Sequence, residues 1–169
     1  MQGRDRLLKQ VQAAIEHEAH LDMPTHPMVM EFADGTLTLA GAVAHVGVKK
    51  LALRAAAGVA GVRGIVDRLH VDAGPSPGDG AMRDAVCRWL LRDIDFQNCA
   101  LHAMVKGQRE TLRQGGRDAS GAIEVAVTDG IVTLSGAVIS LSHKRLAGVL
   151  AWWARGCRDV VNGLEVVPA

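Results

Sequence analysis

Two ten-residue stretches of this chain are nearly identical, DGTLTLAGAV at 34–43 and DGIVTLSGAV at 129–138. The match extends without a gap from 34–74 onto 129–169, where about 16 of the 41 aligned positions are identical. A self-match at one constant shift, here of 95 residues, is typical of a duplicated structural unit. The sequence therefore predicts two small tandem units within its 169 residues.

Each copy reads as helix, strand, strand, helix, strand. In the first, apolar residues recur at helical spacing over the first twenty positions, and Pro24 and Pro27 are expected to end that helix. The β-type runs MVMEFA and TLTLAGAV then flank Asp34-Gly35, a dipeptide typical of a type I′ hairpin turn. A helix over about 48–60 and the strand GIVDRLHV follow, and the second copy repeats this order with helices over about 82–93 and 141–154.

This order predicts an α+β fold of two tandem α-β-β-α-β units. Each unit is expected to form a three-stranded mixed sheet, because a hairpin is antiparallel and a strand–helix–strand crossover is parallel, with both helices on one face. We expect a first domain at 1–73, a Pro/Gly linker at 74–80 and a second domain at 81–169. An extra segment at about 95–121 has no counterpart in the first copy and is expected to form a helical piece and a loop.

Three pairs of glycines occupy matching positions in the two copies. One pair completes the hairpin turns, one lies inside the second strand and indicates a bulge or close backbone approach, and one is expected to end the second helix in a left-handed conformation. These structural glycines are Gly35 and Gly130, Gly41 and Gly136, and Gly61 and Gly156.

The hairpin VAVTDGIVTLSGAV and the closing stretch HKRLAGVLAWWARGCRDVVNGLEVV resemble the BON domain of bacterial osmotically inducible and nodulation proteins. The first copy is a looser match, with Asp67 where the second has Asn162. The resemblance implies a tandem, non-enzymatic binding module. It also implies two alternatives: binding to anionic phospholipid or the cell envelope, as in periplasmic and outer-membrane members, or a cytoplasmic role in osmotic stress as a potassium-responsive or protein-interaction adaptor.

Composition narrows the choice of partner and compartment. The net charge is +1 and aromatic residues make up 3% with no Tyr, so neither a basic field nor a base-stacking platform is available for nucleic acid. No stretch reaches the roughly 18 apolar residues of a membrane span, so no transmembrane segment is expected. The N-terminus lacks the apolar core of a signal peptide, which predicts a cytoplasmic protein as written, or a periplasmic one if a leader was removed.

The cysteines and histidines of this chain are better explained as structural or solvent-exposed residues than as catalytic or metal-binding ones. Cys157 aligns with Val62 and Cys87 lies on an apolar helix face, so both are expected to be buried thiols, and Cys99 is less constrained. His17 and His20 are three residues apart on a helix, but no further ligand lies near them in the sequence. We therefore expect no catalytic centre, no metal and no cofactor.

One helix carries the candidate binding surface. Leu146, Val149, Leu150 and Trp153 share a face and are expected to pack on the sheet, which leaves Trp152 pointing about 100° away. Trp152 then either packs on the extra segment or the other copy, or it serves as an exposed interfacial anchor.

Basic residues flank this tryptophan on both sides. The predicted lipid or partner surface consists of Lys144, Arg145, Trp152, Arg155 and Arg158. Cations beside an amphipathic aromatic side chain suit an anionic headgroup region.

Overall fold

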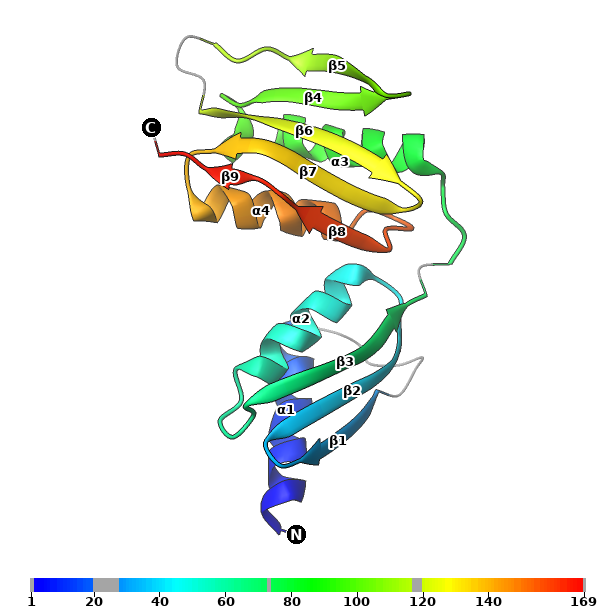
Figure 1. The fold of residues 1–169 in the computed structure, drawn as a ribbon, viewed down its shortest axis with the longest axis vertical. Coiled ribbons are helices and arrows are strands. Elements are labelled where there is room, and N and C mark those ends of the chain that lie inside the picture. Colours follow the sequence, from blue (N-terminus) through cyan, green and yellow to red (C-terminus); the bar gives the residue numbers. More distant parts are fainter. Residues whose placement is uncertain (1, 20–27, 73, 117–119, 169) are drawn as a thin grey trace. The chain divides into compact units, whose positions relative to one another are not determined.

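The chain forms two compact units, Met1–Asp72 and Ala73–Ala169. The computed structural model describes residues 2–19, 28–72, 74–116 and 120–168, so the predicted helix stop at Pro24 and Pro27 lies outside the described residues. Figure 1 shows that both units mix helices with sheets, which confirms the predicted α+β class.

The first unit has the predicted element order. It consists of α1 (Gln2–Ala19), β1 (Val29–Ala33), β2 (Thr36–Val43), α2 (Val46–Ala57) and β3 (Gly64–Val71). β1 and β2 pair antiparallel through the Asp-Gly turn, and β2 and β3 pair parallel over eight residues, so the sheet order is β1-β2-β3. The three-stranded mixed sheet predicted for this copy is therefore confirmed.

A single apolar core holds the helices of the first unit against its sheet. α1 contributes Val11 and Ile15, and α2 contributes Ala52 and Ala56, all of them 0–1% exposed. Leu37 and Leu39 from β2 and Leu69 from β3 complete this core. Both helices therefore cover the same face of the sheet (Figure 1).

The second unit begins and ends with the same elements but has a larger sheet. Its elements are α3 (Asp79–Arg92), the short 3₁₀ helix η1 (Ile94–Phe96), β4 (Ala100–Val105), β5 (Gln108–Arg113), β6 (Gly121–Thr128), β7 (Ile131–Val138), α4 (Leu141–Trp152), β8 (Asp159–Asn162) and β9 (Glu165–Val166). The strand order is β5-β4-β6-β7-β8, and β9 also pairs with β7. α3 begins at Asp79, inside the segment predicted as a Pro/Gly linker.

The extra segment at 95–121 was predicted wrongly as a helical piece and a loop. Apart from η1, it forms the hairpin β4–β5, and β4 adds to the sheet parallel to β6. The second unit therefore has a six-stranded sheet rather than the three-stranded one expected. The hairpin turns at Lys106 (φ 50°) and Gly107 (φ 78°), a left-handed pair like that of an Asp-Gly turn.

Arg113 anchors the added hairpin to the rest of the second unit. Its guanidinium donates to the Leu91 carbonyl at 3.2 Å, to the Cys99 carbonyl at 3.0 Å and to the Phe96 carbonyl. A cation is favourable beside carbonyl groups at the end of a helix, because these groups carry the negative end of the helix dipole. The edge strand β5 is thus tied to the end of α3 and to η1.

The last strand of the second unit is interrupted. β8 pairs with β7 over 131–134 and β9 pairs with it at 137–138, whereas β3 is continuous along β2. The break falls at Gly163, whose amide donates to the Leu134 carbonyl at 2.8 Å. The closing stretch therefore completes the sheet as predicted, but in two pieces.

Candidate functional site

The start of α4 is fixed by a side-chain cap. Ser140 takes an extended conformation, and its hydroxyl accepts from the His143 amide at 3.2 Å and lies 2.6 Å from His143 Nδ1. The His143 ring packs edge-on against buried Phe96, with 5.8 Å between ring centroids. This cap sets where Leu141, Lys144 and Arg145 stand at the beginning of the helix.

Small residues, not large ones, form the buried face of α4. Ala147, Gly148 and Ala151 are buried, while Leu146, Val149 and Leu150 are only half-buried. A Cβ on Gly148 would lie 2.9 Å from Asn162 Nδ2, so the helix approaches β8 closely. The prediction that Leu146, Val149, Leu150 and Trp153 pack on the sheet is wrong for Trp153, which is 40% exposed. Small residues form the buried contact because the helix approaches β8 closely.

Of the two adjacent tryptophans, Trp153 is the more exposed, contrary to the prediction that it packs on the sheet. Trp152 is half-buried, and its Nε1 lies 3.9 Å from a Cβ built on Gly148. Trp153 is 40% exposed and is the C-cap residue of α4, with φ −91° and ψ 2°. An ideal helical wheel fails here because the helix ends at Trp152.

Four positions at four-residue spacing along α4 and its C-cap carry three apolar side chains and one basic side chain. Leu141 is 50% exposed, Arg145 is exposed, Val149 is half-buried and Trp153 is exposed. Residues four apart are neighbours on a helix surface, and each such step turns by about 40° around the axis. We call Leu141, Arg145 and Trp153 the outer face of α4.

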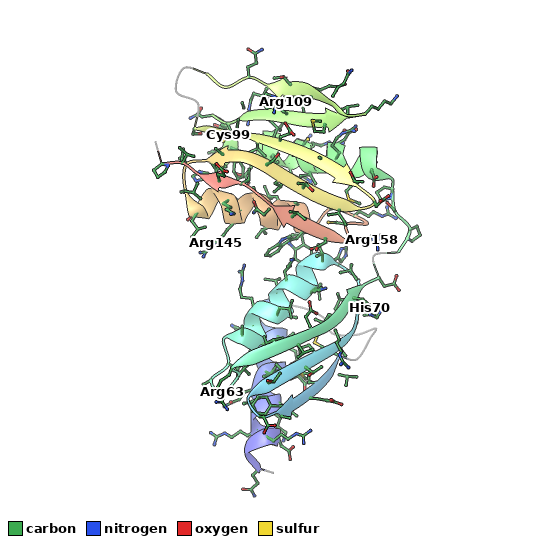
Figure 2. The ribbon with its side chains drawn as sticks, viewed as in Figure 1. Arg63, His70, Cys99, Arg109, Arg145 and Arg158 are labelled. Atoms are coloured by element: carbon green, nitrogen blue, oxygen red, sulfur yellow. The ribbon has the colours of Figure 1, made fainter. Side chains whose placement is uncertain are left out.

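The predicted surface residues do not form one cluster. Arg145 lies near the start of α4 and Arg158 beyond its end (Figure 2), and a 12-residue helix is about 18 Å long. Lys144 is half-buried, and its carbonyl accepts from Asn162 Nδ2 at 2.7 Å. Arg155 and Arg158 are exposed and follow Trp153 in the turn after the helix. The basic groups therefore flank both ends of the outer face.

The six structural glycines occupy left-handed or otherwise positive-φ backbone in both units. Gly35 and Gly130 have φ of 79° and 77° in the hairpin turns, as predicted. A Cβ on Gly136 would lie 2.1 Å from the Ala122 carbonyl oxygen, so a close backbone approach explains this glycine. Its counterpart Gly41 has φ 136°.

The helix-ending role predicted for Gly61 and Gly156 is wrong, because α2 ends at Ala57 and α4 ends at Trp152. Both glycines, with φ of 99° and 81°, lie in the turn that follows the helix.

A carboxylate bound to a hairpin turn was not predicted from the sequence. Asp79, the first residue of α3, accepts from the Asp129 amide through Oδ2 and from the Gly130 amide through Oδ1, each at 2.9 Å. The aliphatic part of Arg158 lies over Gly130, and its guanidinium donates to the Asp129 carbonyl at 3.5 Å. The acidic residue at the start of a helix was the available signal, but its distance of 50 residues from the turn concealed the contact.

The second unit also has a shallow hollow of about 150 Å³ on its sheet, and the residues that line it include His102, Arg109, Glu124 and Ser135. Arg109 donates to Glu124 Oε2 through Nε at 2.8 Å, and its Nη2 lies 2.7 Å from the same oxygen. His102 Nδ1 lies 3.1 Å from the Thr111 hydroxyl. Because Arg109 and Glu124 neutralise each other, this hollow is a weaker candidate for a charged ligand than α4. The sequence missed it because β4 and β5 were not expected.

All three cysteines are buried thiols. Cys157 is 1% exposed, as its alignment with Val62 predicted, and Cys99 is also 1% exposed. Burial, reinforced by the negative charge of Asp84, raises the pKa of the Cys87 thiol to about 11. Cys87 therefore stays protonated at neutral pH, which makes it a poor nucleophile.

Among residues 2–19, 28–72, 74–116 and 120–168, no three His, Cys, Asp or Glu side chains lie together as metal ligands would. His17 is exposed on α1, and His20 lies outside the described residues. Within the same part of the chain, no helix is both long and apolar enough to span a membrane.

The chains found by comparison with solved structures include two of CdsD from Chlamydia trachomatis. One is described as a structural protein of the type III secretion system; it is 15% identical, with a TM-score of 0.32, and the match covers 97% of this chain and 93% of that one. The other is the C-terminal domain of CdsD, also 15% identical, with a TM-score of 0.28 and coverage of 92% and 96%. No curated protein matches the sequence.

The family comparison agrees with the repeat and with the two units. The BON domain model matches residues 4–73 in the first unit and 108–168 in the second, which together exceed half of the chain. Both matched segments contain the hairpin with its Asp-Gly turn, the following helix and the closing strand. The chain belongs to the BON domain family, with one match in each of its two units.

Proposed function

We propose that this protein is a non-enzymatic binding module whose second unit attaches to anionic phospholipid surfaces through the outer face of α4. The observation that carries the proposal is the exposure of Leu141 (50%) and Trp153 (40%) on either side of Arg145. An amphipathic helix with apolar and basic residues on its exposed side suits a position parallel to a membrane interface.

The chemistry of these side chains supports an anionic rather than a neutral surface. Tryptophan favours the headgroup region because its ring is apolar and its N–H is polar. Arg145, Arg155 and Arg158 each add about 1 kcal/mol of attraction near an anionic surface. The net charge of +1 gives little general attraction, so binding depends on these local groups and weakens as salt is added.

Co-sedimentation with two kinds of vesicle tests the proposal. The full chain is expected to pellet with vesicles of phosphatidylcholine mixed with phosphatidylglycerol and to remain in solution with phosphatidylcholine alone. Trp153→Ala and Arg145→Gln are expected to weaken pelleting. Equal or absent binding to the two vesicle types contradicts the proposal.

Matched controls separate the outer face of α4 from general surface properties. Ile94 is 76% exposed and apolar but lies in η1, so Ile94→Ala is expected to bind like the parent chain. Arg88 is exposed on α3, so Arg88→Gln removes the same charge as Arg145→Gln away from the outer face. If these controls weaken binding as much as the α4 variants do, the attachment site is not α4.

A second candidate function, binding of a protein partner, is favoured by the sheet edge of the second unit. β8 is the last strand of its sheet, and Val161, Val166 and Val167 near this edge are 51%, 39% and 56% exposed. Exposed strand edges pair with added strands in many complexes. Val161→Lys is expected to abolish such pairing and to leave vesicle binding unchanged.

A further inference from the structure

The hairpin turns of the two units have the same backbone and the same neighbouring arginine. Asp34 and Gly35 have φ of 51° and 79°, and Asp129 and Gly130 have 52° and 77°. The Arg63 amide donates to the Gly35 carbonyl at 2.8 Å, and the Arg158 amide donates to the Gly130 carbonyl at 2.8 Å. The two turns are therefore equivalent sites whose occupants can be compared.

In the second unit this turn is a carboxylate-binding site that the chain itself fills. The Asp129 and Gly130 amides point to one side and donate to the two carboxylate oxygens of Asp79, one bond of 2.9 Å to each oxygen. Successive backbone N–H groups in a turn form an anion-binding concavity. Hydrogen bonds from N–H groups to an ionised carboxylate are about twice as strong as those between neutral groups.

The first helices of the two units correspond at a shift of 75 residues, which places buried Val11 on Val86 and buried Ile15 on Leu90. The same shift places Leu7 on Met82. These two side chains lie against equivalent glycines, Leu7 Cδ1 at 2.9 Å from a Cβ built on Gly61 and Met82 Cε at 3.4 Å from one on Gly156.

At this shift, the position of Asp79 is occupied by Arg4 in the first unit, and Arg4 is exposed. The residue that neutralises the turn in the second unit is thus replaced by one of opposite charge. Among residues 2–19, 28–72, 74–116 and 120–168, no group accepts from the amides of Asp34 and Gly35.

An arginine side chain already stands at the first-unit turn. The guanidinium of Arg63 lies across Gly35, with Nε at 2.5 Å and Nη2 at 2.9 Å from a Cβ built there, and Figure 2 places Arg63 beside the β1–β2 hairpin. Two N–H donors that have no acceptor among the described residues and a guanidinium therefore lie together at this turn, where Asp34 is exposed and Gly35 is buried beneath Arg63. The carboxylate of Asp34 does not exclude an anion, because Asp129 occupies the same position in the turn that binds Asp79.

We propose that the turn site of the first unit, formed by the Asp34 and Gly35 amides and the Arg63 guanidinium, binds a carboxylate side chain from an acidic segment of a partner protein. The geometry of Asp79 sets the class of ligand, because a carboxylate presents two oxygens to two parallel N–H donors. The site lies in the other unit from the outer face of α4 and does not depend on lipid binding.

Amide NMR of the full chain tests this site with a peptide copied from its own sequence. The probe is the capped peptide of residues 76–82, SPGDGAM, and its control is the same peptide with Asp79→Asn. The Asp34 and Gly35 amide resonances are expected to move saturably with the first peptide and at least several-fold less with the second. The Asp129 and Gly130 resonances are expected to stay in place, since Asp79 occupies their turn. Equal movement with both peptides, or none with either, overturns the proposal.

Three variants and a second anion test the assignment further. Arg63→Gln is expected to weaken the peptide about tenfold, the usual effect of losing one hydrogen bond to a charged group. Arg4→Asp restores the acidic residue of the second unit, so it is expected to fill the turn, shift both amides without peptide and abolish peptide binding. Arg6→Asp makes the same charge change two residues away and is expected to retain most of the binding. If inorganic phosphate moves the two amides and the peptide does not, the assignment to carboxylate is wrong.

Discussion

Lys49 Nζ lies 3.3 Å from Asp67 Oδ2, so an ion pair joins α2 to β3 in the first unit. The corresponding residues of the second unit, Lys144 and Asn162, make a different contact, in which Asn162 Nδ2 donates to the Lys144 carbonyl at 2.7 Å. The Oδ1 atom of each residue acts alike in both units, as the acceptor for the amide two residues further on. Asp67 accepts from the Leu69 amide at 2.9 Å, and Asn162 accepts from the Leu164 amide at 3.3 Å.

This difference predicts that substitutions at the equivalent positions 67 and 162 lower the free energy of unfolding by unequal amounts. Asn162→Ala is expected to lower the free energy of unfolding by about 1–3 kcal/mol, because it leaves the Lys144 carbonyl and the Leu164 amide without their partner. Asp67→Asn keeps the local acceptor and loses only a partly exposed ion pair, so it is expected to cost less than about 1 kcal/mol. Urea unfolding of both variants measures this, and a larger loss for Asp67→Asn contradicts it.

The Asp79 carboxylate is expected to stabilise the second unit. Asp79→Ala removes the acceptor for two turn amides, so we expect a loss of about 1–3 kcal/mol in the free energy of unfolding. Asp84→Ala is the matched control, since Asp84 lies on the same helix and its carboxylate pairs with the adjacent Arg83 instead of with turn amides. Thermal unfolding followed by circular dichroism compares the two, and equal losses indicate that the turn contact contributes nothing.

Gly136 is expected to tolerate no side chain. A Cβ there would meet the Ala122 carbonyl oxygen at 2.1 Å, and φ of 110° is unfavourable for any other residue. Gly136→Ala is expected to cost more than about 4 kcal/mol or to prevent folding. Gly116→Ala, where nothing lies within 4 Å of the new Cβ, is expected to leave the melting temperature nearly unchanged. A folded Gly136→Ala with parental stability contradicts the strand pairing described for β6 and β7.

The raised pKa of the Cys87 thiol predicts a loss of folding stability at alkaline pH. Burial and the nearby charge of Asp84 raise the pKa of this thiol from 9.0 to about 11, so the folded state keeps a proton that the unfolded state releases. The stabilisation is complete below pH 9.0 and declines as the pH rises toward about 11. Urea midpoints across this range are expected to fall more steeply for the parent chain than for Cys87→Val. Parallel declines contradict the raised pKa.

The sequence predicted the parts of the fold that depend on local chemistry. Asp-Gly pairs readily adopt a left-handed backbone conformation, so this dipeptide was enough to predict the turns at Asp34 and Asp129. The alternation of apolar and polar residues in strands, and the helical spacing of apolar residues, then predicted the remaining elements of the first unit. The hairpin β4–β5 was missed because Lys106 is an uncommon residue at a left-handed position and because the exposed strand β5 lacks an apolar face.

The candidate site was predicted less well because it depends on contacts far apart in the chain. A helical wheel placed Trp153 inside, whereas the close approach of Gly148 to β8 and the end of α4 at Trp152 place it at the surface. The contact between Asp79 and the turn at Gly130 joins residues whose pairing no local pattern indicates.

The fluorescence of Trp153 alone tests the central claim, attachment through the outer face of α4. The chain has three tryptophans, so Trp89→Phe with Trp152→Phe leaves Trp153 as the sole reporter. With vesicles of phosphatidylcholine and phosphatidylglycerol, its emission is expected to shift to shorter wavelength as the ring enters the headgroup region, and to return as salt is added. With phosphatidylcholine alone the emission is expected not to change. A chain that pellets with the anionic vesicles while the Trp153 emission stays that of the free protein contradicts the account.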